Sequence, residues 1–112
     1  MPIIVNPRGS LIDIINSEYD SSIDERRKKL VLQSYYKYGP AKQNFGEGRV
    51  DALASAKLCI DKFERTKNTE YLMDAMNYLM FRIKYPIPGD YFEYTSSEKS
   101  AGTVGTPINL ER

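Results

Sequence analysis

The stretch Thr69–Tyr85, TEYLMDAMNYLMFRIKY, decides the fold of this chain. Five apolar residues recur here at the i, i+3, i+4, i+7, i+11 spacing that places side chains on one face of an α-helix: Leu72, Ala75, Met76, Leu79 and Ile83. Three more make the helix apolar around most of its circumference: Met73, Met80 and Phe81. Such a helix is typically central, with neighbours on two or more sides. Pro86 ends it, because proline lacks the N–H that a continuing helix needs.

A second helical pattern comes directly before this one and begins near Arg49 or Val50. Its expected buried residues share one face: Val50, Leu53, Ala56, Ile60 and Phe63. Cys59 lies beside that stripe, where a thiol behaves as a small hydrophobic group. The connection is short, and we expect Asn68 to take the left-handed conformation and Asn68 or Thr69 to cap the next helix. So short a link predicts an antiparallel αα-hairpin over about residues 49–85.

A further helix is predicted from Ser22 to about Tyr38, ending before Gly39-Pro40. Ser22 with Glu25 three residues later has the spacing of a reciprocal capping box. One face of this helix should pack across the hairpin: Ile23, Arg27, Leu30, Val31, Ser34, Tyr35 and Tyr38. The basic residues beside it are interpreted as a solvated face: Arg26, Lys28 and Lys29. Residues 11–16 could form a short helix capped by Ser10, or an extended segment.

The fold class predicted is therefore mostly α, a three-helix arrangement built on the hairpin with an irregular C-terminal segment. We expect a single domain over 1–112, with an N-terminal segment 1–21, a helical core 22–85 and an irregular tail 86–112. Phe45, in the glycine-rich loop 39–48, should fill the core from that loop. Tyr91, Phe92 and Tyr94 should fold back onto the hairpin, and residues 95–112 should be mobile unless a ligand or second subunit orders them.

Composition excludes several chemistries. The chain has no histidine and one cysteine, which excludes a disulfide framework, a Cys/His zinc site, a Ser-His-Asp triad and a Cys-His pair. Its net charge of +1 gives no global basic field for nucleic acid, so nucleic-acid binding is not expected. No run approaches the length of a membrane span, and no signal peptide is evident. We expect a cytoplasmic protein with no cofactor.

Three groups of residues were candidates for function. Four carboxylates could bind Mg²⁺ across the hairpin, as in small nucleotide pyrophosphatases of the MazG type: Asp61, Glu64, Glu70 and Asp74. The EExxE motif of those enzymes is absent, and solvated charges explain the same residues. The segment TSSEKSAGTVGTP, residues 95–107, has the small residues of a phosphate-binding loop, but it lacks a P-loop motif, and its composition favours a flexible tail. The nine tyrosines suit either a binding surface or the rim of a small core.

The run from Tyr38 to Tyr85 resembles the sequences of a known group of small proteins. Its loop YGPAKQNFG, its turn NTEYLMDAMNY and the later segment SSEKSAGTVG are similar to small proteins encoded by phages and prophages of Gram-positive bacteria. The resemblance covers about residues 35–105, and Lys67 stands where that family would have glycine. The family has no assigned activity, so the resemblance supplies a context. It implies a small accessory protein that acts by binding.

From these observations we predict a non-enzymatic phage accessory protein that counters host defence by sequestering a nucleotide-derived signalling molecule. The ligand would lie where the tail meets the hairpin of a neighbouring subunit in a homo-oligomer. Stacking and charge would come from Tyr78, Arg82, Lys84, Tyr85, Tyr91 and Tyr94. Phosphate or ribose contacts would come from Ser96, Ser97, Lys99, Ser100, Gly102 and Thr103. One alternative is a protein-binding inhibitor of a host defence protein, and the second is the Mg²⁺-dependent pyrophosphohydrolase.

Overall fold

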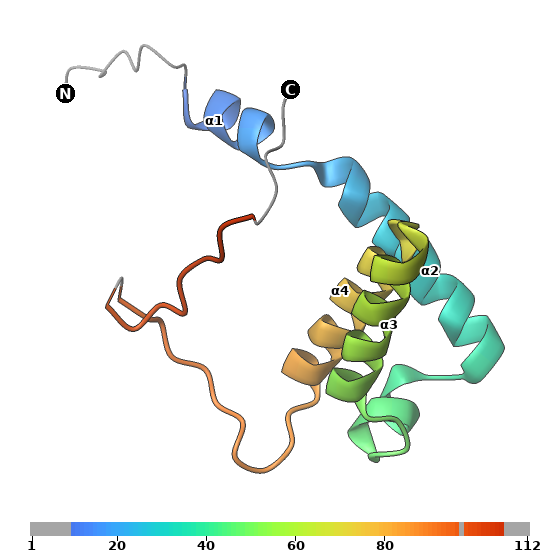
Figure 1. Cartoon of the computed structure of the whole chain (residues 1–112). Helices are drawn as coiled ribbons and strands as arrows, with labels where there is room; N and C mark the ends of the chain where they lie inside the picture. The colour runs from blue at the N-terminus through green and yellow to red at the C-terminus, as the bar shows by residue number, and fades with distance from the viewer. Residues whose placement is uncertain (1–9, 97, 107–112) are drawn as a thin grey trace.

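A computed structural model describes residues 10–96 and 98–106, and everything below concerns these residues. The regular structure in these residues is all helical, with no strand among them (Figure 1). The elements are α1 (Leu11–Glu18), α2 (Ser21–Tyr38), the π-helical turn η1 (Lys42–Gly46), α3 (Ala52–Thr66) and α4 (Glu70–Lys84). Residues 85–106 follow as an irregular segment. The predicted fold class, with the hairpin at its centre, is confirmed.

Helices α3 and α4 form the antiparallel hairpin (Figure 1). Helix α3 begins at Ala52 rather than near Arg49, because the Asp51 side chain accepts a hydrogen bond of 3.0 Å from the amide of Ala54 and so caps the helix there. The residue in the left-handed conformation is Lys67, with φ 62°, and not Asn68 as predicted. The Asn68 side chain instead accepts a hydrogen bond of 3.0 Å from the amide of Glu70 and satisfies the start of α4.

The buried face of α3 agrees with the prediction at Ala56, which is buried, and at Phe63, which is half-buried. It differs at Leu53 and Ile60, which are 36% and 42% exposed, while Ala52 is buried and Cys59 is half-buried in their place. Alanine at the contact lets the two backbones approach closely, so the larger side chains lie at the edge of the interface. On α4 the predicted apolar face is likewise only partly covered. Ala75 is buried, but Ile83 is 78% exposed.

Helix α4 is central, as predicted, because α2 packs on its other side (Figure 1). Asn77 and Phe81 are the buried side chains there. On α2 the predicted inner face is half-buried from Ile23 to Val31. It becomes exposed over its last turns, where Tyr35 and Tyr38 are 51% and 65% exposed. The C-terminal half of α2 therefore leaves the hairpin uncovered.

The predicted capping box of α2 is wrong in its position. Asp20 is the N-cap, its carboxylate accepts from the amide of Ser22, and the helix begins at Ser21. A capping box does occur one helix earlier, where Ser10 and Asp13 exchange bonds at the start of α1. This resolves the ambiguity over residues 11–16 in favour of a helix.

Helix α1 and the C-terminal segment stand away from the hairpin (Figure 1). Leu11, Ile12 and Ile15 are 80%, 71% and 60% exposed, and α1 has no buried residue. The predicted packing of Tyr91, Phe92 and Tyr94 on the hairpin is wrong, because their side chains are 86%, 77% and 89% exposed. The Cα radius of gyration is 18.1 Å, against about 13 Å for a compact domain of this length. No helix of the described residues is long and apolar enough to cross a membrane.

Candidate functional site

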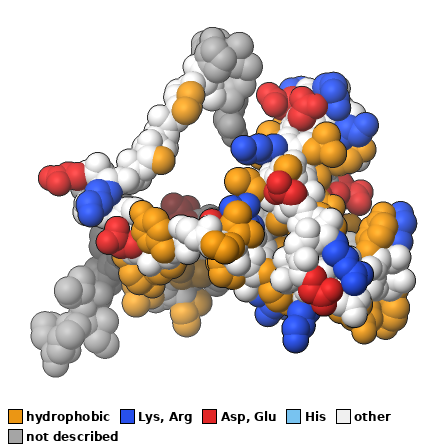
Figure 2. Space-filling model, turned by 90° about the horizontal axis from the view of Figure 1, so that it is seen from below, with side chains coloured by type: hydrophobic (Ala, Val, Ile, Leu, Met, Phe, Trp, Pro, Cys, Tyr) orange, Lys and Arg blue, Asp and Glu red, His pale blue; other side chains and the backbone are white. Residues whose placement is uncertain are grey.

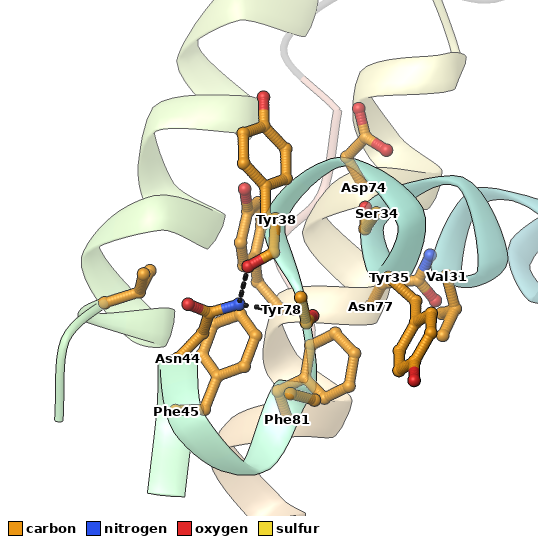
Figure 3. A pocket seen from close by; sticks show the side chains of 13 residues that line it. Val31, Ser34, Tyr35, Tyr38, Asn44, Phe45, Asp74, Asn77, Tyr78 and Phe81 are labelled. Carbon is orange, nitrogen blue, oxygen red and sulfur yellow. Dashed lines mark hydrogen bonds between the residues drawn. The ribbon is translucent and has the colours of Figure 1, made fainter. Parts of the chain in front are cut away.

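The candidate site is a groove between α2, η1 and α4, which we call the α2–α4 groove (Figure 3). Its volume is about 300 Å³, at the lower end of the range for ligand-binding cavities. It forms where the exposed C-terminal half of α2 separates from α4. The lining residues are Val31, Ser34, Tyr35, Tyr38, Gly39, Ala41, Asn44, Phe45, Val50, Asp74, Asn77, Tyr78 and Phe81.

The floor of the groove is aromatic. Phe45, carried by η1, stacks on Phe81 with ring centroids 4.5 Å apart and an interplanar angle of 12°. It meets Tyr78 edge-on, with centroids 6.0 Å apart. Gly46 follows, and a Cβ atom there would lie 3.3 Å from the Tyr85 ring, so glycine permits this close approach. The prediction that Phe45 fills the core from its loop is confirmed.

Asn44 holds η1 against the end of α2. Its side-chain amide donates to the carbonyl of Tyr38 over 3.1 Å, shown by a dashed line in Figure 3. The backbone carbonyl of Asn44 accepts a hydrogen bond of 2.8 Å from the amide of Val50. One residue therefore fixes the turn to the helix before it and to the chain after it, and this positions Phe45.

Asp74 gives the groove its only charged side chain. It lies on α4 at the end away from Phe45 and Phe81 (Figure 3). The half-buried carboxylate receives no hydrogen bond and no ion pair from the rest of the described chain. Desolvation raises the pKa of Asp74, and the nearby charge of Glu70 raises it further.

Two groups close to Asp74 share its environment: Tyr78, which lines the groove, and Cys59 on α3, which does not. Burial raises the pKa of Tyr78, and the neighbouring Cys59, Asp74 and Tyr38 add to that rise. Burial also raises the pKa of the Cys59 thiol, with a contribution from Asp74, so Cys59 is not an activated nucleophile. The groove thus has an apolar end and an end where a carboxylate and two tyrosine hydroxyls collect.

No family model, curated protein or solved structure matches this chain. The site is therefore interpreted from its own geometry. Over the described residues, no three His, Cys, Asp or Glu side chains gather into a group that could hold a metal ion. Of the four carboxylates considered for Mg²⁺, Asp61 pairs with Arg65 over 3.1 Å and Asp74 lies in the groove.

The predicted ligand-binding residues of the hairpin are not brought together. Tyr78 lines the groove, whereas Arg82 is bound by Asp90 through contacts of 2.6 and 3.1 Å. The Lys84 ammonium lies 5.8 Å from the centroid of the Tyr85 ring. Tyr91 and Tyr94 are exposed on the irregular segment. Arg82 is thus already engaged within its own chain.

The predicted phosphate-binding residues lie on the irregular segment, and Ser97 is outside the described residues. The amides of Lys99 and Ser100 both donate to the carbonyl of Ser96 over 3.0 Å, and the amide of Gly102 donates to the Ser100 hydroxyl over 3.3 Å. The Lys99 ammonium lies 4.0 Å from Glu93. Thr103 is exposed. The amides of Lys99, Ser100 and Gly102 are therefore used within the segment itself.

The groove itself was not predicted. The sequence marks Asp74 as a candidate metal ligand and gives no signal for Asn44. One signal was present in the sequence. Asp74 is the only charged residue between Glu70 and Arg82, in an otherwise apolar helix. An acid at such a position is either solvated or placed for binding.

Proposed function

We propose that this protein is a non-enzymatic accessory protein that binds a protein partner through the α2–α4 groove. The observation that carries the proposal is the unpaired, half-buried carboxylate of Asp74 at the end of an aromatic groove. A buried charge without a partner is costly, and an incoming cation would remove that cost. Arginine and lysine side chains combine an apolar stem with a cationic head, which matches the two ends of the groove.

The geometry favours the protein-binding alternative over the nucleotide. Phosphate groups would be repelled by Asp74, and Arg82 and the amides of Lys99, Ser100 and Gly102 already have partners in the same chain. Tyrosine rings around a carboxylate suit a guanidinium, which stacks on aromatic faces and forms charge-assisted hydrogen bonds. The resemblance to phage accessory proteins adds the context of a host protein in the bacterial cytoplasm as partner. Nucleotide sequestration stays a prediction.

The first experiment titrates the ¹⁵N-labelled protein with N-acetyl-arginine N-methylamide and follows the amide signals of Asp74, Tyr78 and Asn44. Weak but saturable shifts are expected, with a dissociation constant on the order of 1 mM for so small a probe. The neutral isostere, N-acetyl-citrulline N-methylamide, should bind at least about tenfold more weakly. Equal binding of the two probes, or no binding at the groove, would count against the proposal.

The matched variants are Asp74→Asn and Glu64→Gln. Both remove one carboxylate, but Glu64 is exposed on α3 outside the groove. Only Asp74→Asn should lose the arginine probe. Native mass spectrometry of the protein purified from bacterial cells tests the wider function. A stoichiometric protein partner lost with Asp74→Asn supports the proposal, and a bound small molecule absorbing near about 260 nm would revive the nucleotide hypothesis.

A further inference from the structure

The charges of α1 and α2 are segregated along the chain. Residues 10–25 contain five acidic side chains and no basic ones: Asp13, Glu18, Asp20, Asp24 and Glu25. Residues 26–42 contain six basic side chains and no acidic ones: Arg26, Arg27, Lys28, Lys29, Lys37 and Lys42. Helix α1 thus belongs to an acidic block, and most of α2 to a basic one. Two such segments are complementary when they run antiparallel.

Apolar side chains accompany both blocks on exposed surfaces. On α1, Leu11 and Ile15 are one helical turn apart and are 80% and 60% exposed. On the outer face of α2, Leu32 and Tyr36 have the same spacing and are 55% and 79% exposed. In the described chain nothing covers either pair. An exposed apolar pair of this size is not unusual on its own, but the pair on α1 and the pair on α2 have the same spacing.

One acidic residue of α1 and one basic residue of α2 have the same spacing from these apolar pairs. From Leu11 the steps to Ile15 and Glu18 are four and three residues, and from Tyr36 the steps back to Leu32 and Lys29 are also four and three. An antiparallel alignment therefore places Leu11 beside Tyr36, Ile15 beside Leu32, and Glu18 beside Lys29. Glu18 and Lys29 are exposed, and neither forms an ion pair within the described residues.

This alignment does not form within one chain, because α1 is directed away from α2 (Figure 1). The Tyr19 hydroxyl, just after α1, donates a hydrogen bond of 2.7 Å to Asp24 in the first turn of α2, which holds the junction in this arrangement. Only two residues separate α1 from α2, so little chain is left for α1 to turn back along α2. With the junction held in this way, the two surfaces meet between two copies.

We infer that the protein forms an antiparallel homodimer in which α1 of each copy packs on the outer face of α2 of the other. The contact is isologous, so each copy contributes both the acidic and the basic surface. Figure 2 shows hydrophobic side chains on the surface beside acidic and basic ones. The inner face of α2, which lines the α2–α4 groove, stays open in this dimer. The inference is therefore independent of the proposed function.

Sedimentation velocity over a concentration series tests this directly. The wild-type protein should show a monomer–dimer equilibrium that weakens at high ionic strength, because exposed charges are screened. Glu18→Lys and Lys29→Glu should each weaken dimerisation by about tenfold. The double variant, Glu18→Lys with Lys29→Glu, should restore it, since the pair is reversed. Leu32→Asp should abolish the dimer, and all these positions are exposed, so folding should be retained and is checked by circular dichroism.

A matched control is Lys62→Glu, an exposed charge reversal on α3 that lies outside both helices. It should leave the dimer unchanged. A wild-type protein that is monomeric at every concentration would overturn the inference. So would a dimer that is insensitive to the variants of α1 and α2, or a double variant that does not recover.

Discussion

Arg27 and Asn77 hydrogen-bond to each other in both directions, fifty residues apart in the sequence. The Arg27 guanidinium donates to the side-chain oxygen of Asn77 over 3.1 Å, and the Asn77 side-chain amide donates to the backbone carbonyl of Arg27 over 3.2 Å. Asn77 is only 6% exposed. A buried amide satisfied at both ends fixes the position of one helix on another, so this pair sets how α2 crosses the hairpin.

Replacement of Asn77 by alanine should therefore be strongly destabilising. It leaves the Arg27 carbonyl and guanidinium without these partners, which costs about 1–3 kcal/mol of the free energy of unfolding. Urea denaturation followed by circular dichroism measures the change. Gln33→Ala, on the exposed face of α2, is the control and should stay within about 0.5 kcal/mol of the wild type. Equal effects of the two changes would show that the pair does not join α2 to the hairpin.

Phe45→Ala should destabilise the fold and open the groove. The ring is half-buried and stacks on Phe81, so its loss should cost about 2 kcal/mol, less than for a fully buried phenylalanine. The amide signals of Tyr78 and Phe81 should shift at the same time. Tyr91→Ala removes an exposed ring outside both the groove and the inferred dimer contact, and it should affect stability little. An unchanged midpoint for Phe45→Ala would contradict the role of this ring in the core.

The helices and the hairpin could be predicted because their signals are local. Pro86 ends α4, a short link joins α3 to α4, and an apolar α4 needs neighbours on two sides. The exposure of Leu53 and Ile60 on α3 could not be predicted from periodicity. Leu53 and Ile60 have the same spacing as Ala52 and Cys59, and only the approach of α4 decides which face is buried.

The groove could not be predicted from the sequence either, because it too depends on how separate elements pack. It depends on Asn44 holding η1 against α2 and on Arg27 meeting Asn77, and neither contact follows a repeating pattern. The N-cap of α2 was predicted at the wrong residue because several suitable residues are adjacent there. Asp20, Ser21 and Ser22 are all good N-cap residues, and Asp20 takes the position. The wrong predictions thus concern positions that are set by non-local packing or by a choice among several suitable N-cap residues.

Lys67→Gly should stabilise the hairpin. Lys67 has φ 62°, where a side chain costs roughly 1–2 kcal/mol that glycine avoids, although glycine also loses more chain entropy on folding. The net gain should be about 0.5 kcal/mol. Lys62→Gly, within helix α3, should instead lose about 1 kcal/mol. Thermal unfolding distinguishes the two, and a loss of stability with Lys67→Gly would contradict the left-handed turn.

The Arg82–Asp90 pair should make the start of the irregular segment sensitive to acid. The hydrogen bonds from Arg82 hold the pKa of Asp90 below its usual range, and the Ile87 amide donates to the same carboxylate over 3.2 Å. Because the folded-state pKa is depressed, the attachment is fully present above the ordinary carboxyl pKa and is lost as pH falls through the lowered value. The Ile87 amide signal, followed from about pH 6 to about pH 2, should report that loss. Asp90→Asn should remove the transition, and Glu93→Gln, an exposed acid three residues later, should keep it.

Asp74→Asn should raise stability while it removes binding of a cation. Burial raises the pKa of Asp74 above its unfolded value, so the folded state disfavours the ionised form. The sign is the reverse of that for Asp90: stability is greatest below the ordinary carboxyl pKa and falls as pH rises through the raised folded-state value. At neutral pH the neutral amide removes this cost, and the midpoint of thermal unfolding should rise by about 2 °C, a gain that disappears in acid.

The control for Asp74→Asn is Glu64→Gln, because removal of this exposed carboxylate should change neither stability nor binding of the arginine probe. A carboxylate retained at a cost to stability is expected where binding requires it, and a lower midpoint for Asp74→Asn at neutral pH would instead assign Asp74 to holding the fold.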